Sequence, residues 1–238
     1  MAETKSKKGA PAAGEATLNQ NEAFILKYKY PIIGGVIVIV LAIAAVLFFN
    51  HQAKTSHEKA ATEMAKGQEY FTVGMGYFDE AQFEMALNGD STGFVGFAKL
   101  ATDLSGDDGN LANLYAGLCC AHLDKWEEAA QYLEKFDGAG DQMISPAALG
   151  ALGNVYAHLN QLDKAVENLK KAAKNADNIS LSPSFLIQAG QILESQDKKA
   201  EALAAYQEAK SYIDKMPQQT QAQTGRFDID AYIERVSE

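Results

Sequence analysis

The sequence that decides the fold is AALGALGNVYAHLNQLDKAVENLKKA, at residues 147–172. Two other stretches share its pattern: LANLYAGLCCAHLDKWEEAAQYLEKF at residues 111–136, and SFLIQAGQILESQDKKAEALAAYQEA at residues 184–209. The three stretches begin 36 and 37 residues apart. Self-similarity at such an interval is typical of proteins built from stacked helical units. The sequence therefore predicts three copies of one structural unit.

Small and bulky residues recur at the same places in each copy. Each copy has a glycine, then an alanine twelve residues later, then a bulky residue four residues after that. These residues are Gly117, Ala129 and Leu133, then Gly153, Ala165 and Leu169, then Gly190, Ala202 and Tyr206. Two helices joined by a short polar turn account for this spacing, with the small residues where the helices approach closely. Each hairpin alone leaves one face uncovered, so we expect neighbouring hairpins to stack.

This pattern resembles the tetratricopeptide repeat, in which a Leu-Gly pair is followed by an aromatic residue and by two alanines. The middle copy matches best, through Leu152, Gly153, Tyr156, Ala165, Leu169 and Ala172. The resemblance implies an all-α solenoid of helical hairpins, with three repeats in residues 105–216. We expect a helical stalk and a degenerate leading repeat in residues 51–104, with Phe94 to Leu104 as a candidate second helix. A capping helix that includes Phe227 is expected in residues 217–238.

A second feature is the uncharged stretch IIGGVIVIVLAIAAVLFF at residues 32–49. An α-helix of this length spans about 27 Å, close to the roughly 30 Å hydrocarbon core of a bilayer. A buried core helix and a cleaved signal peptide are the alternatives. However, the stretch is apolar on every side, and about thirty mostly polar residues precede it. We therefore predict a transmembrane anchor helix at residues 31–50.

The charge distribution suggests how such an anchor is oriented. Residues 1–30 contain five lysines and three glutamates, which gives this segment a net charge of +2. Because the whole chain has a net charge of −10, the remaining residues have a net charge of −12. Lysines beside a membrane helix favour the cytoplasmic side. We therefore predict a disordered cytoplasmic tail at residues 1–30 and a large domain across the membrane. The acidic domain has no basic surface cluster, which argues against nucleic acid as a partner.

The order of these elements is similar to that of the YfgM-type ancillary subunits of the SecYEG translocon. This resemblance implies a single-pass protein of the bacterial inner (cytoplasmic) membrane. Its periplasmic repeat domain would associate with the translocon and with periplasmic chaperones or clients, while the anchor would contact membrane lipid. The alternative is a constitutive scaffold subunit of a cell-envelope complex. Both are protein–protein interaction roles, and neither requires an enzyme.

The resemblance to the repeat family also implies which residues face the concave surface. They are Leu114, Leu118 and His122 in the first copy, Gly150, Asn154 and His158 in the second, and Ile187, Gln191 and Glu194 in the third. None is Lys or Arg, which disfavours a clamp for a peptide carboxylate and favours a helix or an extended segment as ligand. The two histidines have an alternative interpretation as ordinary helix-surface residues.

Catalytic and metal-binding patterns are not apparent in the sequence. The four histidines do not have metal-site spacing, and no nucleophile–base arrangement is recognisable. Cys119 and Cys120 are adjacent, so they are poorly placed to form a disulfide with each other. They are interpreted as small packed residues, with a redox or metal site as the alternative. We therefore expect no enzymatic activity, no cofactor and no bound metal.

Overall fold

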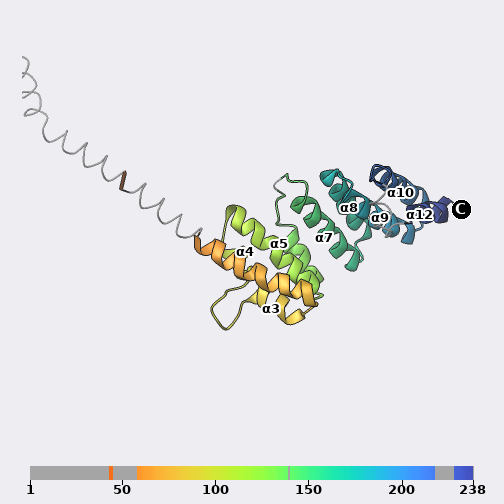
Figure 1. Cartoon of the computed structure of the whole chain (residues 1–238). Helices are drawn as coiled ribbons and strands as arrows, with labels where there is room; N and C mark the ends of the chain where they lie inside the picture. Colours follow the sequence, from red (N-terminus) through yellow and green to blue (C-terminus); the bar gives the residue numbers. More distant parts are fainter. Residues whose placement is uncertain (1–42, 45–57, 139, 218–227, 238) are drawn as a thin grey trace, which may run out of the picture. The chain divides into compact units, whose positions relative to one another are not determined.

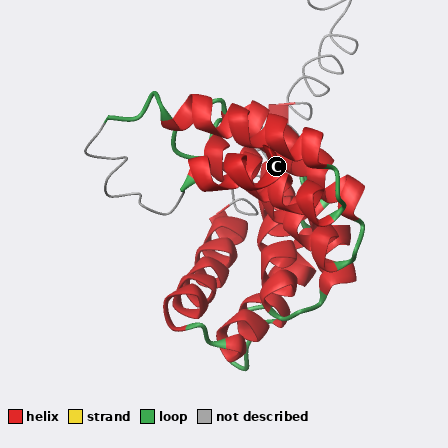
Figure 2. Cartoon of the chain, turned by 90° about the vertical axis from the view of Figure 1, so that its right-hand side faces the viewer, coloured by secondary structure: helices red, strands yellow, loops and turns green. Residues whose placement is uncertain are grey.

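The computed structural model describes residues 43–44, 58–138, 140–217 and 228–237 (Figure 1). The regular secondary structure of these residues is helical, as the helices in Figure 2 show. The chain from Lys59 onward forms one compact unit. Of the stretch 32–49, only Ile43 and Ala44 are described, and the predicted tail and Phe227 lie outside the described residues. Among the described residues, no helix is both long and apolar enough to cross a membrane.

The helices follow one another as hairpins along the chain (Figure 1). After a helix at residues 58–77 come α3 Glu80–Asn88, α4 Phe97–Asp103, α5 Gly106–His122, α6 Trp126–Leu133, α7 Ile144–His158, α8 Leu162–Ala176, α9 Ser182–Ser195, α10 Lys199–Ile213 and α12 Ile229–Ser237. The pairs α5–α6, α7–α8 and α9–α10 pack internally. Each pair also contacts the next, through α6–α7 and α8–α9. This is the tetratricopeptide-like solenoid that the sequence predicts.

The turn inside each hairpin has the same geometry in all three copies. Asp124, Asn160 and Asp197 have φ angles of 57°, 56° and 59°, in the left-handed region. Asp and Asn tolerate this region better than most residues because their short polar side chains bond locally. The next N–H in each turn donates back to the preceding helix, as from Lys125 to the Cys120 carbonyl at 2.9 Å. These are the hydrogen bonds of a Schellman helix end.

The aligned glycines lie where the two helices of a hairpin touch. Gly117 lies against Leu133, Gly153 against Leu169 and Gly190 against Tyr206. A Cβ atom at these glycines would lie 2.6, 2.8 and 2.4 Å, respectively, from the nearest side-chain atom. The aligned alanines Ala129, Ala165 and Ala202 are fully buried. The close approach of the paired helices therefore requires small residues at these positions.

In the leading hairpin two short helices, α3 and α4, follow the first helix, and α4 lies within the predicted helix Phe94 to Leu104. The ring of Phe83 in α3 lies against Gly74, and the rings of Phe94 and Phe97 lie against Gly67. Both glycines belong to the helix at residues 58–77, so α3 and α4 pack at successive levels along it. The segment 89–96 between them contains three glycines with positive φ, which ends one helix before the next begins.

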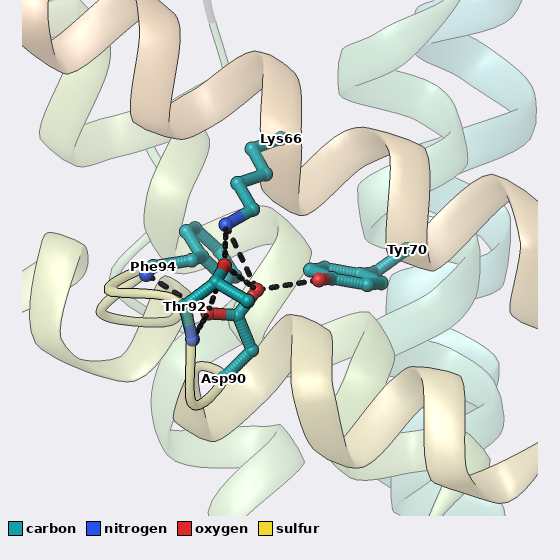
Figure 3. Close-up of polar contacts among 5 residues, drawn as sticks. All are labelled: Lys66, Tyr70, Asp90, Thr92 and Phe94. Carbon is teal, nitrogen blue, oxygen red and sulfur yellow. Dashed lines mark hydrogen bonds and ion pairs between the residues drawn. The ribbon is translucent and has the colours of Figure 1, made fainter.

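Asp90 holds this connecting segment against the first helix (Figure 3). Its carboxylate accepts hydrogen bonds from the Tyr70 hydroxyl at 2.5 Å and from the Thr92 and Phe94 backbone N–H groups at 2.7 and 3.1 Å. The Lys66 ammonium lies 2.8 Å away, and the Asp90 side chain is only 5% exposed. The Lys66 hydrogen bond is the main reason why the pKa of Asp90 is well below its usual value.

Candidate partner-binding face

The structure separates the predicted concave residues into covered and accessible groups. Leu114 and Ile187 are 6% and 3% exposed and belong to the hydrophobic core. Gly150 is covered by the Phe185 ring of α9, the first helix of the next hairpin. Leu114 and Ile187 were predicted to contact a partner, but their burial makes them packing residues instead. These positions lie on the first helix of each hairpin, and they are covered when neighbouring hairpins stack on one another.

The polar concave residues of the third hairpin contact the C-terminal helix α12, although Gln191 stays exposed. The Gln191 amide donates to the Tyr232 hydroxyl at 3.2 Å. The Glu194 carboxylate accepts from Arg235 at 2.6 and 2.7 Å and from the Tyr206 hydroxyl at 2.9 Å. The hydrogen bonds from Arg235 lower the pKa of Glu194. In this structure these two predicted binding residues therefore serve to hold α12, which the repeat pattern alone did not indicate.

The two histidines occupy equivalent places and make equivalent contacts. His122 stacks on Phe83 of α3, with ring centroids 4.4 Å apart and planes 3° from parallel. His158 stacks on Trp126 of α6, at 3.7 Å and 5°. Each histidine thus covers an aromatic ring of the preceding hairpin. Burial lowers the pKa of His122, so its imidazole is neutral near pH 7.

The predicted polar residues that are exposed are His122, Asn154, His158 and Gln191, and two of them lie on α7. Asn154 and His158 are both exposed there, and Leu118 on the contacting helix α5 is half-buried. Together with Trp126, which lies beneath His158, we call these four residues the central face. An amide, an imidazole stacked on an indole and an aliphatic side chain offer hydrogen bonds and apolar contact without a Lys, Arg, Asp or Glu. Such a surface suits a peptide segment better than a charged ligand.

The cysteines lie in the core and not on this face. Cys119 and Cys120 are both fully buried and unpaired. Burial raises the pKa of Cys120 to about 12 and raises the pKa of Cys119 as well, so both thiols stay protonated at neutral pH. Across the described ranges, no group of three His, Cys, Asp or Glu residues could hold a metal ion. The packing interpretation of the cysteines therefore fits their environment.

The stacked helical hairpins define an α-helical repeat protein. A family model described as a tetratricopeptide repeat-like domain matches residues 22–228, and the chain belongs to this family. Domains of this kind bind protein partners and are typically non-catalytic. The search of curated proteins gave no match.

Proposed function

We propose that the protein is a membrane-anchored interaction module that couples a secretory translocon to periplasmic chaperones or client chains. The observation that carries the proposal is the central face, where Asn154 and His158 are exposed on the middle hairpin. His122 and Gln191 are exposed as well, but each contacts an end element, Phe83 of α3 or Tyr232 of α12. On the N-terminal side His122 stacks on α3, and on the C-terminal side Glu194 binds α12. A partner segment would therefore dock at the middle hairpin.

The membrane part of the proposal rests on the apolar stretch at residues 32–49 and on the charge difference across it. An anchor would hold the repeat domain near membrane-bound partners and raise its effective concentration there. The bacterial inner membrane, with the tail in the cytoplasm and the repeat domain in the periplasm, is the arrangement that this charge difference favours.

Cysteine labelling in intact cells would test the orientation. Because both natural thiols are buried, they should contribute little background. Lys5→Cys and Gln207→Cys each add a single new thiol, the second on the exposed surface of α10. A membrane-impermeant maleimide should label Gln207→Cys in intact cells, and Lys5→Cys only after lysis. Labelling of Lys5→Cys before lysis would contradict the proposed orientation.

Photocrosslinking in native membranes would test the binding role. A photoreactive residue at Asn154 probes the central face, and one at Gln207 on α10 serves as the matched control. Translocon subunits, periplasmic chaperones or nascent secretory chains captured from Asn154 and not from Gln207 would support coupling. Capture of one unrelated envelope complex would make the protein a scaffold subunit and end the translocon assignment. Equal capture from both positions would exclude the central face as the docking surface.

A further inference from the structure

A second surface lies at the turn between the helix 58–77 and α3. Tyr77 and Phe78 are 81% and 86% exposed, and Met75 is 43% exposed. We call these three residues the aromatic tip. Large apolar side chains that are this exposed and contiguous mark contact sites more often than chance. The tip belongs to the leading hairpin and shares no residue with the central face.

Phe78 has a backbone conformation that its residue type disfavours. Its φ angle is 53°, matching the 57°, 56° and 59° of Asp124, Asn160 and Asp197 in the later hairpins. The turn hydrogen bond is equivalent too, since the Asp79 N–H donates to the Gly74 carbonyl at 3.2 Å. Three of these four turns thus have an Asp or Asn at the left-handed position, whereas the leading turn has a bulky aromatic residue there.

Within the described structure, packing of the Phe78 side chain does not offset the energetic cost of its left-handed backbone conformation. A ring that is 86% exposed gains almost nothing from burial, and an asparagine at this position would relieve the strain. Unfavourable backbone geometry that packing leaves uncompensated tends to occur where a residue makes a functional contact. An exposed ring held in this conformation is therefore a candidate contact for a partner.

Charge around the tip distinguishes between the possible occupants. Residues 67–98 contain five acidic residues and no Lys, Arg or His. Within the described chain, Lys125 pairs with Glu84 and Lys66 with Asp90, but no ion pair forms at Glu69, Asp79 or Glu80. Asp79 and Glu80 directly follow Phe78. An anionic bilayer would repel these carboxylates, whereas a basic protein surface would attract them.

We propose that the aromatic tip is a protruding anchor that inserts into an apolar pocket of a partner protein, with Lys or Arg side chains at the pocket rim facing Asp79 and Glu80. The aromatic rings supply the buried contact, and the two carboxylates orient the tip and exclude partners with acidic rims. This surface acts independently of the central face. The protein can therefore hold one partner at the tip while a peptide segment occupies α7.

The test uses the full chain in native membranes with a photoreactive residue at Tyr77. Gln161, which is exposed immediately after the equivalent turn residue Asn160, is the matched control position. We expect a discrete protein adduct from Tyr77 and not from Gln161, with the crosslinked site mapped by mass spectrometry beside Lys or Arg. Phe78→Asn should reduce the yield by at least about tenfold, as for other central aromatic anchors.

Phe78→Asn also separates loss of contact from loss of folding. Because asparagine fits the left-handed conformation, this variant should unfold at the same temperature as the natural protein or at a higher one. A lower unfolding temperature would refute the strain argument. Adducts with phospholipid or with a second copy of this chain, or a captured protein that lacks basic residues at the contact, would overturn the proposed partner. Absence of any adduct specific to Tyr77 would overturn the docking site itself.

Discussion

Replacing Gly190 with alanine adds one methyl group where α9 packs on α10. The new Cβ would lie 2.4, 2.7 and 2.8 Å from three ring atoms of Tyr206, all well inside ordinary van der Waals contact. The ring cannot move away easily because Tyr206 is fully buried. Its hydroxyl donates to Glu194 at 2.9 Å, and its ring lies 5.2 Å from that of Tyr232. The added methyl group must therefore displace a tethered side chain.

The size of the effect follows from two opposing contributions. Overpacking a filled core costs about 1–3 kcal/mol, and the tethered ring places this site near 3 kcal/mol. Alanine recovers about 1 kcal/mol because it favours the helix over glycine. The expected net loss is about 2 kcal/mol of unfolding free energy. For a unit of this size, that corresponds to a decrease of about 4–8 °C in the unfolding temperature.

Helical circular dichroism during denaturant unfolding would measure this loss, with Gly76→Ala as the matched control. Gly76 also lies in a helix, but a Cβ there would meet nothing within 4 Å. The control should therefore gain up to about 1 kcal/mol from helix propensity alone. If Gly190→Ala proves as stable as the natural protein or more stable, close contact is not what requires glycine in the hairpins.

Three further measurements address the leading hairpin, the core and the C-terminal helix. Lys66 holds the pKa of Asp90 in the folded protein below its value of about 4 in unfolded chains. The ionised Asp90 carboxylate therefore stabilises the folded state above that pH, and this contribution to the unfolding free energy is lost as the pH falls. Asp90→Asn should therefore unfold at a lower temperature than the natural protein at pH 7. The difference between the two unfolding temperatures should become smaller towards pH 3, and a difference that does not depend on pH would contradict this reasoning. Cys119 and Cys120 should resist a thiol reagent until denaturant is added, and rapid labelling of the native protein would refute their burial. Arg235→Ala should speed hydrogen exchange throughout α12, since it removes the bidentate contact with Glu194; unchanged exchange would show that apolar packing alone holds this helix.

The hairpin fold could be predicted from sequence because its main contacts lie at fixed short separations. Gly153 and Leu169 are sixteen residues apart and touch, as do Gly117 and Leu133. The turn between the two helices has a left-handed residue at the same place in every copy, and this conformation favours Asp or Asn at that position. A pattern of this kind is visible in the sequence without knowledge of distant contacts.

The contacts within the leading hairpin could not be predicted in the same way because they lie at other separations. Gly67 meets Phe97 thirty residues later, with α3 inserted between them. In the three repeats the glycine and the side chain that it contacts are sixteen residues apart, so an alignment with that spacing does not pair Gly67 with Phe97. The glycines of segment 89–96 and the Asp90 carboxylate, which hold α3 and α4 in position, have no equivalents in the three-copy pattern.

Sequence comparison within the repeats predicts positions on the concave surface but not which of them remain accessible. Accessibility depends on the elements that flank the three repeats, and a short solenoid must cover both of its ends. Here α12 takes up Glu194, and the leading hairpin supplies the ring that His122 covers. The contacts that stabilise the two ends thus use predicted binding residues. Asn154 and His158 are the exposed polar residues of the predicted concave surface for which the described structure gives no hydrogen bond or ring contact to α3 or α12, and this is why the proposed docking site lies at the middle hairpin.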